Sequence, residues 1–326
     1  MKTAIITGAL GQDGSFLSEH LLELDHKVYG ITRRKSTDAD SWGFLEHLKG
    51  NPNFKLIHGD ITDPIFISNL ISDIKPTKLF NLGAQSHVGY SFQNPYTTFE
   101  TDACAVVHML SALQKHSPAT RFYQASTSEL FGGINCPSAG YGEISPFHPR
   151  SPYGVAKLAS HWSTINFREA YGMFSCAGIL FNHESQRRGL DFVTRKVTNG
   201  VARIKAGLDT KIVMGNIDAY RDWGYAKDYV KMMNLMLEAD VPQEYVIATG
   251  KAYSIKNLLE LSFSLVGIDN WEDYVEFDER FMRPSEVPYL LGDPTKAERE
   301  LGWVPETSFE SLIKIMLESD LKRYGI

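Results

Sequence analysis

The chain has 326 residues, which is enough for two domains at the usual size of about 150 residues each. Hydrophobic residues make up 43% and charged residues 22%, as in ordinary globular proteins, so a disordered or fibrous protein is excluded. The formal net charge of −6 excludes the broad basic surface on which nonspecific nucleic-acid binding depends. Three widely spaced cysteines, and no stretch apolar enough for a membrane helix or signal peptide, lead us to expect a cytoplasmic protein without disulfides, nucleic-acid partners or membrane partners.

From Ala4 to Gly189, short apolar runs alternate with longer amphipathic segments, as in parallel strands joined by crossover helices. This pattern predicts a Rossmann-type, doubly wound parallel sheet of the α/β class. Later segments are less regular and predict a smaller, mixed C-terminal domain. There we expect a helix from Asp293, as N-cap, to Gly302, and an amphipathic closing helix over residues 308–322. The six expected strands lie at 4–6, 28–31, 54–57, 78–81, 121–124 and 175–180.

A glycine turn, Gly8-x-x-Gly11-x-x-Gly14, lies between the first expected strand and a helical segment. In this context the glycines let the backbone approach a dinucleotide pyrophosphate, which binds at the helix N-terminus. The alternative is a tight turn without a ligand.

The second expected strand is followed by Arg33, Arg34 and Lys35. An acidic residue at this place binds the ribose of NAD, whereas arginine pairs with the 2′-phosphate of NADP. The basic run therefore predicts NADP, with a solvated basic loop as the alternative. Asp60 and the segment 82–84 follow the third and fourth strands, where the adenine and the nicotinamide ribose are approached.

Tyr153 is the only one of the fifteen tyrosines with a lysine, Lys157, four residues further on. On a helix this spacing places both side chains on one side. An ammonium group favours the phenolate form of a nearby phenol, so we expect Tyr153 to act as a base. The alternative is an exposed aromatic residue beside a solvated lysine.

Polar residues 126–129 follow the fifth strand, where open α/β sheets bind ligands. Thr127 is a candidate to hydrogen-bond a sugar hydroxyl, and Glu129 is a candidate acid and base at carbon; the alternative for Glu129 is a carboxylate at a helix N-terminus. Arginines among aromatic residues in the C-terminal part suit a diphosphate, although each alone fits a surface salt bridge. They include Arg188, Arg195, Arg221 and Arg283. His183 and Glu184 lack further ligands at metal-binding spacing, so we expect no metal.

The segments 7–15, 81–88, 123–130 and 181–185 resemble those of the GDP-mannose 4,6-dehydratases, which are extended members of the short-chain dehydrogenase/reductase superfamily. The likeness runs nearly end to end. The chain departs from the family pattern at Leu10, where threonine is usual, at Gln186, where proline is usual, and in the loop after Arg34.

The resemblance implies an NADP-dependent enzyme with three groups of site residues. The catalytic residues are Thr127, Glu129, Tyr153 and Lys157. The cofactor contacts are Gly8, Gly11, Gln12, Asp13, Arg33, Arg34, Asp60, Ile61, Leu82, Gly83, Ala84, Gln85, Ser86, Tyr96, Tyr153, Lys157, His183 and Arg188. The contacts to a GDP-linked sugar are Ser86, Thr127, Ser128, Glu129, Asn182, Val193, Lys196, Arg221, Arg283 and Glu286. The family also implies a homo-oligomer, either a dimer or a tetramer.

The expected Rossmann domain comprises residues 1–182 and about 217–250, and the expected sugar-nucleotide-binding cap comprises about 183–216 and 251–326. The expected reaction converts GDP-mannose to GDP-4-keto-6-deoxymannose by transient oxidation at C4, loss of water across C5 and C6, and return of hydride to C6. One alternative applies the same chemistry to a GDP-manno-heptose. More distant alternatives are a sugar-nucleotide epimerase or reductase and a noncatalytic NADP-binding protein.

Overall fold

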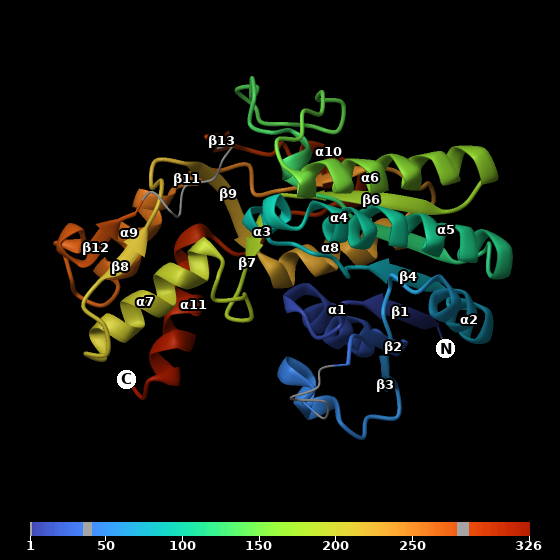
Figure 1. Cartoon of the computed structure of the whole chain (residues 1–326), viewed down its shortest axis with the longest axis horizontal. Coiled ribbons are helices and arrows are strands. Elements are labelled where there is room, and N and C mark those ends of the chain that lie inside the picture. The colour runs from blue at the N-terminus through green and yellow to red at the C-terminus, as the bar shows by residue number, and fades with distance from the viewer. Residues whose placement is uncertain (1, 35–40, 279–286) are drawn as a thin grey trace.

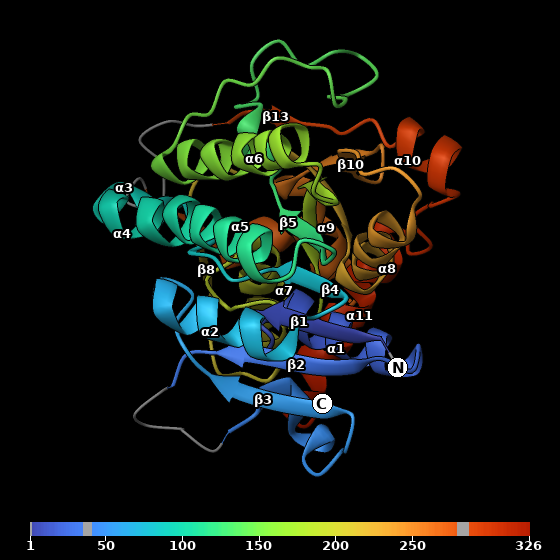
Figure 2. The same ribbon diagram turned by 90° about the vertical axis from the view of Figure 1, so that its right-hand side faces the viewer.

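The computed structural model describes residues 2–34, 41–278 and 287–326. Its centre is a seven-stranded sheet in the order β10-β6-β5-β4-β1-β2-β3, in which every neighbouring pair is parallel. Strand order runs outward in both directions from the β1–β4 pair, so this pair is the switch point of a doubly wound sheet. Figure 2 shows β4, β1, β2 and β3 following one another across the sheet. The strands are β1 (Thr3–Thr7), β2 (Lys27–Thr32), β3 (Phe54–His58), β4 (Lys78–Asn81), β5 (Arg121–Ala125), β6 (Ser175–Leu180) and β10 (Tyr245–Ile247).

Helices cover both faces of the large sheet (Figure 1). On one face α1 (Gln12–Glu23) and α8 (Ala226–Glu238) pack into one apolar cluster with the sheet. On the other face α2 (Pro64–Ile74) and α5 (Ala105–His116) form a second cluster, and α6 (Pro152–Tyr171) packs beside α5. Strands that are covered on both faces bury side chains on both sides, which is why their centres stand out in the sequence as short, largely apolar runs.

The doubly wound sheet and its six expected strands are confirmed, and a seventh strand was not predicted. β10 has only three residues and follows α8, so it leaves little pattern in the sequence. It pairs in parallel with β6 at the edge of the sheet. The Glu143 carboxylate accepts a hydrogen bond from the Val246 backbone N–H at 2.7 Å, so this edge strand is also held by a side chain from a distant loop.

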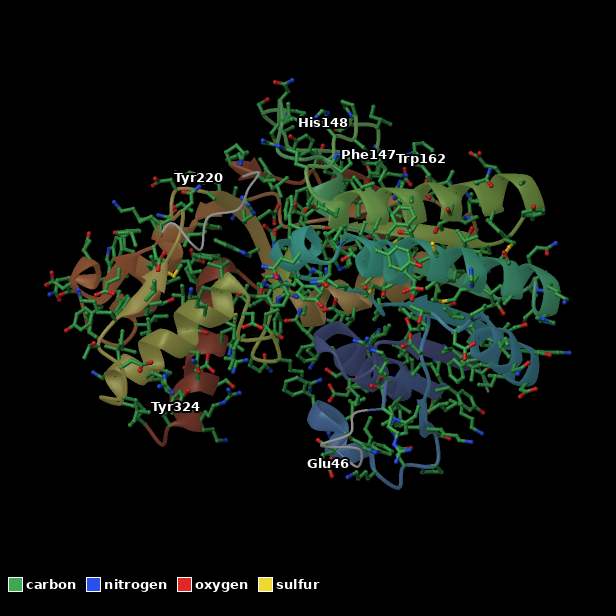
Figure 3. The ribbon with its side chains drawn as sticks, viewed as in Figure 1. Glu46, Phe147, His148, Trp162, Tyr220 and Tyr324 are labelled. Carbon is green, nitrogen blue, oxygen red and sulfur yellow. The ribbon has the colours of Figure 1, made fainter. Side chains whose placement is uncertain are left out.

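That loop runs from residue 131 to 151 and rises above α6 at the top of Figure 1. Its Phe147 packs edge-on against Trp162 of α6, with ring centroids 6.4 Å apart, and Figure 3 shows these two residues close together. The ring of His161, also on α6, lies 5.1 Å from Phe147. The loop is therefore anchored to the helix that carries the Tyr-Lys pair.

A smaller, mixed unit lies at the left of Figure 1. In its four-stranded sheet, β9 pairs antiparallel with β11 and parallel with β7 and β13, while β8 and β12 form a separate parallel pair. Three helices pack around an apolar cluster that contains Trp223 and Phe263. The elements are β7 (Asn182–Glu184), α7 (Val193–Lys205), β8 (Ile212–Met214), β9 (Tyr220–Tyr225), β11 (Ala252–Ser254), α9 (Ile255–Ser264), β12 (Val275–Phe277), β13 (Tyr289–Leu290) and α11 (Phe309–Arg323).

The two C-terminal helices follow the expected pattern with one shift. α10 (Thr295–Leu301) begins after Pro294 rather than directly after Asp293, whose carboxylate accepts a hydrogen bond from the Thr295 N–H at 3.0 Å. Gly302 ends this helix with a φ of 64°, as glycine commonly does. Ser308 caps α11, and its hydroxyl accepts from the Ser311 N–H at 3.2 Å. In the described ranges, no helix combines the length and apolarity needed to span a membrane.

Candidate active site

The candidate site lies where β1, β4, β5 and β6 end, beside the switch point of the sheet. A hydrogen-bonded network joins the ends of β1 and β4. The Thr7 hydroxyl donates to the Asn81 side chain at 2.6 Å and accepts from the Leu82 and Gly83 N–H groups at 3.0 and 2.9 Å. This network fixes the segment after β4 against the glycine turn after β1.

The glycine turn is shaped by close backbone contacts. Gly8 has a φ of 68°, and a Cβ on it would lie 3.0 Å from the Leu82 carbonyl oxygen. A Cβ on Gly14 would lie only 2.3 Å from the Gly8 carbonyl oxygen. α1 begins after Gly11, and no described side chain caps its first turn. Unpaired N–H groups at a helix N-terminus attract phosphate, so the turn fits the pyrophosphate of a dinucleotide.

Tyr153 and Lys157 lie in the first two turns of α6. Ser151 caps the helix through the Gly154 N–H at 3.0 Å, and Pro152 occupies the first helical position. The exposed fractions of Tyr153 and Lys157 are 8% and 4%, so the alternative of an exposed aromatic residue and a solvated lysine is wrong. Lys157 Nζ lies 5.8 Å from the centre of the Tyr153 ring and donates to the Ala125 carbonyl oxygen at 2.8 Å.

The electrostatic surroundings shift the pKa values of this pair in opposite directions. Burial lowers the pKa of Lys157, although the carboxylate of Asp102 partly opposes the shift. Burial raises the pKa of Tyr153, and Asp102 adds to the rise, while a hydrogen bond with Thr127 opposes it. A cationic nicotinamide ring beside the phenol would act against this rise and lower the pKa of Tyr153, as a base near neutral pH requires.

Thr127 and Glu129 lie beside Tyr153. Thr127 follows β5 and caps the short 3-10 turn Ser128–Leu130 by accepting from the Glu129 N–H at 3.3 Å. The charge of the Glu129 carboxylate acts on the Tyr153 phenol, and Thr127 is hydrogen-bonded to it. The structure therefore brings together all four residues that the resemblance names as catalytic. Ser128 in the same turn is buried.

An ion pair between Asp13 and His183 joins the start of α1 to β7. The His183 Nε2 lies 2.8 Å from the Asp13 carboxylate, and its Nδ1 lies 2.8 Å from the Phe181 carbonyl oxygen. Burial alone would lower the pKa of His183, but Asp13 outweighs it and raises the pKa. Burial alone would raise the pKa of Asp13, but His183 outweighs it and lowers the pKa. Gln12 joins the same two segments, because its side chain donates to the His183 carbonyl oxygen at 3.0 Å and accepts from the Ser185 hydroxyl at 2.8 Å.

Arg188 lies between β7 and α7. Its guanidinium lies 3.5 Å from the centre of the Phe192 ring, and its Nε lies 3.1 Å from the Glu184 carboxylate without hydrogen-bond geometry. Its positive charge acts on Tyr153.

The neighbouring Arg187 turns away instead. It donates to Ser15 at 3.0 Å and to Glu19 at 2.8 Å, so it fastens this segment to α1.

Arg195 is not available to a diphosphate. It is 1% exposed, and its guanidinium donates two bonds to Asp320, which is fully buried. It also donates to the Gln186 and Arg188 carbonyl oxygens at 2.6 and 3.1 Å. The interpretation of Arg195 as a diphosphate contact or surface ion pair is therefore wrong, because sequence spacing does not reveal a partner 125 residues away.

Three cap-side candidates lie on β7 and α7. Asn182 begins β7, and Val193 begins α7 with Lys196 one turn further on. Burial lowers the pKa of Lys196, which is only partly exposed.

Arg221 lies on β9 at 7% exposure and donates to the Tyr220 carbonyl oxygen at 2.8 Å. Figure 3 places Tyr220 at the upper edge of the cap. Lys35, Arg283 and Glu286 lie outside the described residues.

The remaining cofactor candidates surround the ends of β2, β3 and β4. Arg33 and Arg34 are exposed directly after β2. The Asp60 carboxylate accepts from the Thr62 N–H at 3.0 Å, and Ile61 beside it is buried. Ala84, Gln85 and Ser86 follow the Gly83 turn, and Tyr96 is 77% exposed on the short helix α4 (Pro95–Phe99).

The sequence analysis missed one residue at this site, the buried Asp102. Its backbone follows α4, and its side chain accepts from the Gln85 N–H at 2.7 Å. The signal available in the sequence is an aspartate whose helical neighbours at i+3, i+4 and i+7 are Ala105, Val106 and Met109, all of them buried.

A doubly wound parallel sheet with this glycine turn and a buried Tyr-x-x-x-Lys pair defines an NAD(P)-dependent enzyme of the extended short-chain dehydrogenase/reductase class. Solved structures share the fold. A UDP-glucose 4-epimerase from Thermotoga maritima has a TM-score of 0.85 at 25% identity, over 98% of this chain and 99% of that one. A dTDP-glucose 4,6-dehydratase from Bacillus anthracis, solved in complex with NAD, has a TM-score of 0.85 at 18% identity, over 100% and 98%.

The sequence comparisons specify the family. The family model described as GDP-mannose 4,6 dehydratase matches residues 5–316, and the chain belongs to this family. GDP-mannose 4,6 dehydratase 1 of Arabidopsis thaliana is 46% identical over 98% of this chain and 90% of its own length. The GDP-mannose 4,6-dehydratase of Vibrio cholerae is 44% identical over 99% and 94%. The human GDP-mannose 4,6 dehydratase is 44% identical over 98% and 92%.

Proposed function

We propose that this chain removes water from GDP-mannose with the help of NADP and produces a GDP-linked 4-keto-6-deoxy sugar. The observation that carries the proposal is the cluster of Tyr153, Lys157, Thr127 and Glu129 beside the glycine turn. The relatives named GDP-mannose 4,6-dehydratase, at 44–46% identity, favour GDP-mannose over the heptose alternative. Glu129 favours a dehydratase over an epimerase or reductase, because those reactions need no base at carbon.

The cofactor fits the residues around the glycine turn. Gly8 and Gly14 allow close backbone contacts that a Cβ would prevent, and the first turn of α1 is uncapped by the described side chains. Arg33 and Arg34 are the candidates to pair with a 2′-phosphate, which NAD lacks. When bound, NADP supplies a two-electron oxidant for C4 of the sugar and afterwards returns the electrons to C6.

The side chains supply the proton transfers. Tyr153 accepts the proton of the C4 hydroxyl, Lys157 favours its phenolate form, and Thr127 orients the hydroxyl. Oxidation at C4 makes the C5 hydrogen acidic, and Glu129 removes that proton. Glu129 then donates a proton to the leaving C6 hydroxyl, so that one carboxyl group serves both steps of the elimination. C5 afterwards takes up a proton from solvent, which balances the hydride returned to C6.

The GDP part of the substrate is assigned to the cap. Asn182, Val193, Lys196 and Arg221 are the described candidates, and Arg283 and Glu286 complete the assignment. The bounds expected from the sequence, 1–182 and about 217–250 for the cofactor domain and about 183–216 and 251–326 for the cap, place Asn182 and Arg221 in the cofactor domain. β9 pairs with β7, β11 and β13, which supports moving the second boundary toward Ala226. A homo-oligomer and a cytoplasmic location are also proposed.

The test is incubation with GDP-mannose and NADP in heavy water, without added reductant, followed by NMR. The expected product has lost the C6 hydroxyl and carries deuterium at C5. Parallel reactions with NAD and with a GDP-manno-heptose test the cofactor and the sugar. Unchanged GDP-mannose, or a product epimerised or reduced at C4 only, would contradict the proposal.

A further inference from the structure

One acidic residue, Asp102, lies buried against the helix that carries the Tyr-Lys pair. It is in a π-helical turn, Glu100–Cys104, between α4 and α5. Such turns insert one extra residue into a helix and occur frequently at functional sites. This turn packs against α6, and Figure 1 shows α4 and α5 running beside α6.

Among the described residues, one group donates a hydrogen bond to the Asp102 carboxylate, and the carboxylate is almost wholly buried. The residue is 1% exposed, and its Oδ1 accepts from the Gln85 N–H at 2.7 Å. Its Oδ2 is buried and receives no hydrogen bond from the described residues. A buried carboxylate with so few partners is costly unless a positive charge lies nearby.

That positive charge is the Lys157 ammonium. Burial raises the pKa of Asp102 to about 6, and Lys157 and the Gln85 N–H oppose the rise. Conversely, Asp102 is the largest influence that opposes the lowering of the Lys157 pKa by burial. Among the helices that pack on this turn, α4 carries Tyr96 and α5 carries His108, but the charged group that acts on Asp102 is Lys157 of α6. Each group therefore favours the ionised form of the other.

Asp102 acts on Tyr153 in two opposing ways. Directly, its negative charge raises the pKa of the phenol. Indirectly, its charge favours the protonated form of Lys157, and the Lys157 ammonium group beside the Tyr153 ring lowers the pKa of the phenol. The indirect effect requires a charge on Asp102, whereas the hydrogen bond to Gln85 requires only an acceptor oxygen. A substitution that removes the charge of Asp102 but keeps its acceptor oxygen therefore tests the effect on Lys157 without removing the hydrogen bond from Gln85.

We propose that Asp102 is a positioning residue of the active site, whose buried carboxylate keeps Lys157 protonated while it anchors the segment after β4 through Gln85. The inference rests on the proposed function, because it concerns the lysine that activates the base Tyr153. The proposal assigns a role to Asp102, a buried carboxylate that takes no part in the proton transfers described above.

The first test measures kcat and KM against pH for the wild type and Asp102→Asn. Asparagine keeps the acceptor oxygen for Gln85 and removes the charge. We expect the basic limb of the kcat profile, where Lys157 loses its proton, to move down by about one pH unit, so that kcat at pH values above the limb falls about tenfold with little change in KM. A basic limb at the wild-type pH would overturn the proposal. Asp228→Asn is the control and should leave the limb in place, because it changes a buried carboxylate of α8 that accepts from the Thr307 N–H.

A second measurement does not depend on turnover or on the folding of Asp102→Asn. In Lys157→Met the counter-charge is lost, so Asp102 should take up a proton at neutral pH. Infrared spectroscopy of the holoprotein should then show the carbonyl stretch of a protonated carboxylic acid that is weaker or absent in the wild type, and its absence from Lys157→Met would refute the coupling. If the wild type itself does not convert GDP-mannose, the proposed function fails, while the infrared result still decides the coupling between Asp102 and Lys157.

Discussion

Gly14 offers a direct test of the proposed pyrophosphate site. A Cβ there would lie 2.3 Å from the Gly8 carbonyl oxygen and 2.7 Å from the Ala9 Cα, whereas real Cβ atoms keep at least 3.0 Å. In Gly14→Ala the start of α1 must therefore move away from the turn by about 0.7 Å. Overpacking of this kind costs about 1–3 kcal/mol, which exceeds the gain of about 1 kcal/mol from alanine in a helix.

We expect a larger effect of Gly14→Ala on the affinity for the cofactor. The shift moves N–H groups that would donate to the pyrophosphate, and each hydrogen bond to a charged group contributes about 1.5–3 kcal/mol. We therefore expect the Kd for NADP, measured by isothermal titration calorimetry, to rise at least about tenfold, with a lower melting temperature. Gly142→Ala is the matched control, because no described atom lies within 4 Å of its added Cβ. Wild-type NADP affinity in Gly14→Ala would refute the assignment of the turn.

Three further predictions address other parts of the site. Glu129→Gln should still bind NADP but lose C5 deuterium exchange and product formation by NMR; full turnover would remove its role. Arg195→Met leaves Asp320 buried without its charge partner and should lower the free energy of unfolding, measured in urea, by about 3–5 kcal/mol; a loss under about 1 kcal/mol would contradict this. Because the His183 pKa is raised and the Asp13 pKa lowered, their ion pair stabilises the fold most near pH 6 and less as pH rises through the folded His183 pKa. The wild-type advantage over His183→Gln in denaturation should shrink accordingly, and a pH-independent difference would exclude the pair.

Much of the large sheet could be predicted because its signals are local. Each expected strand is a continuous apolar run, and the glycine turn follows the first one at short range. β10 could not be predicted in the same way, because three residues are too few to form a pattern. Its place in the sheet depends on pairing with β6 and on the Glu143 side chain, about a hundred residues earlier in the chain.

The charged residues were harder to predict because their roles depend on partners distant in sequence. Arg188 and Arg195 lie seven residues apart in the sequence. The guanidinium of Arg188 packs on the Phe192 ring, whereas Arg195 is buried against Asp320. Asp102 likewise gains its significance from burial and from Lys157, 55 residues further on. Composition and spacing identify such residues as candidates, whereas tertiary packing decides which of them face a ligand.

The position of Lys157 explains how one fold can serve different sugar nucleotides. Asn81 at the end of β4 donates to Gln124 on β5 at 2.8 Å, Gln124 donates to the Ala125 carbonyl oxygen at 2.9 Å, and Lys157 donates to the same oxygen at 2.8 Å. The lysine is thus fixed to the sheet, through side chains that are themselves buried. The proposed contacts to the GDP part of the substrate, by contrast, lie mostly on the smaller unit. Changes in the cap can therefore alter which sugar is bound without moving the Tyr-Lys pair, which accords with a shared fold between this chain and an epimerase at 25% identity.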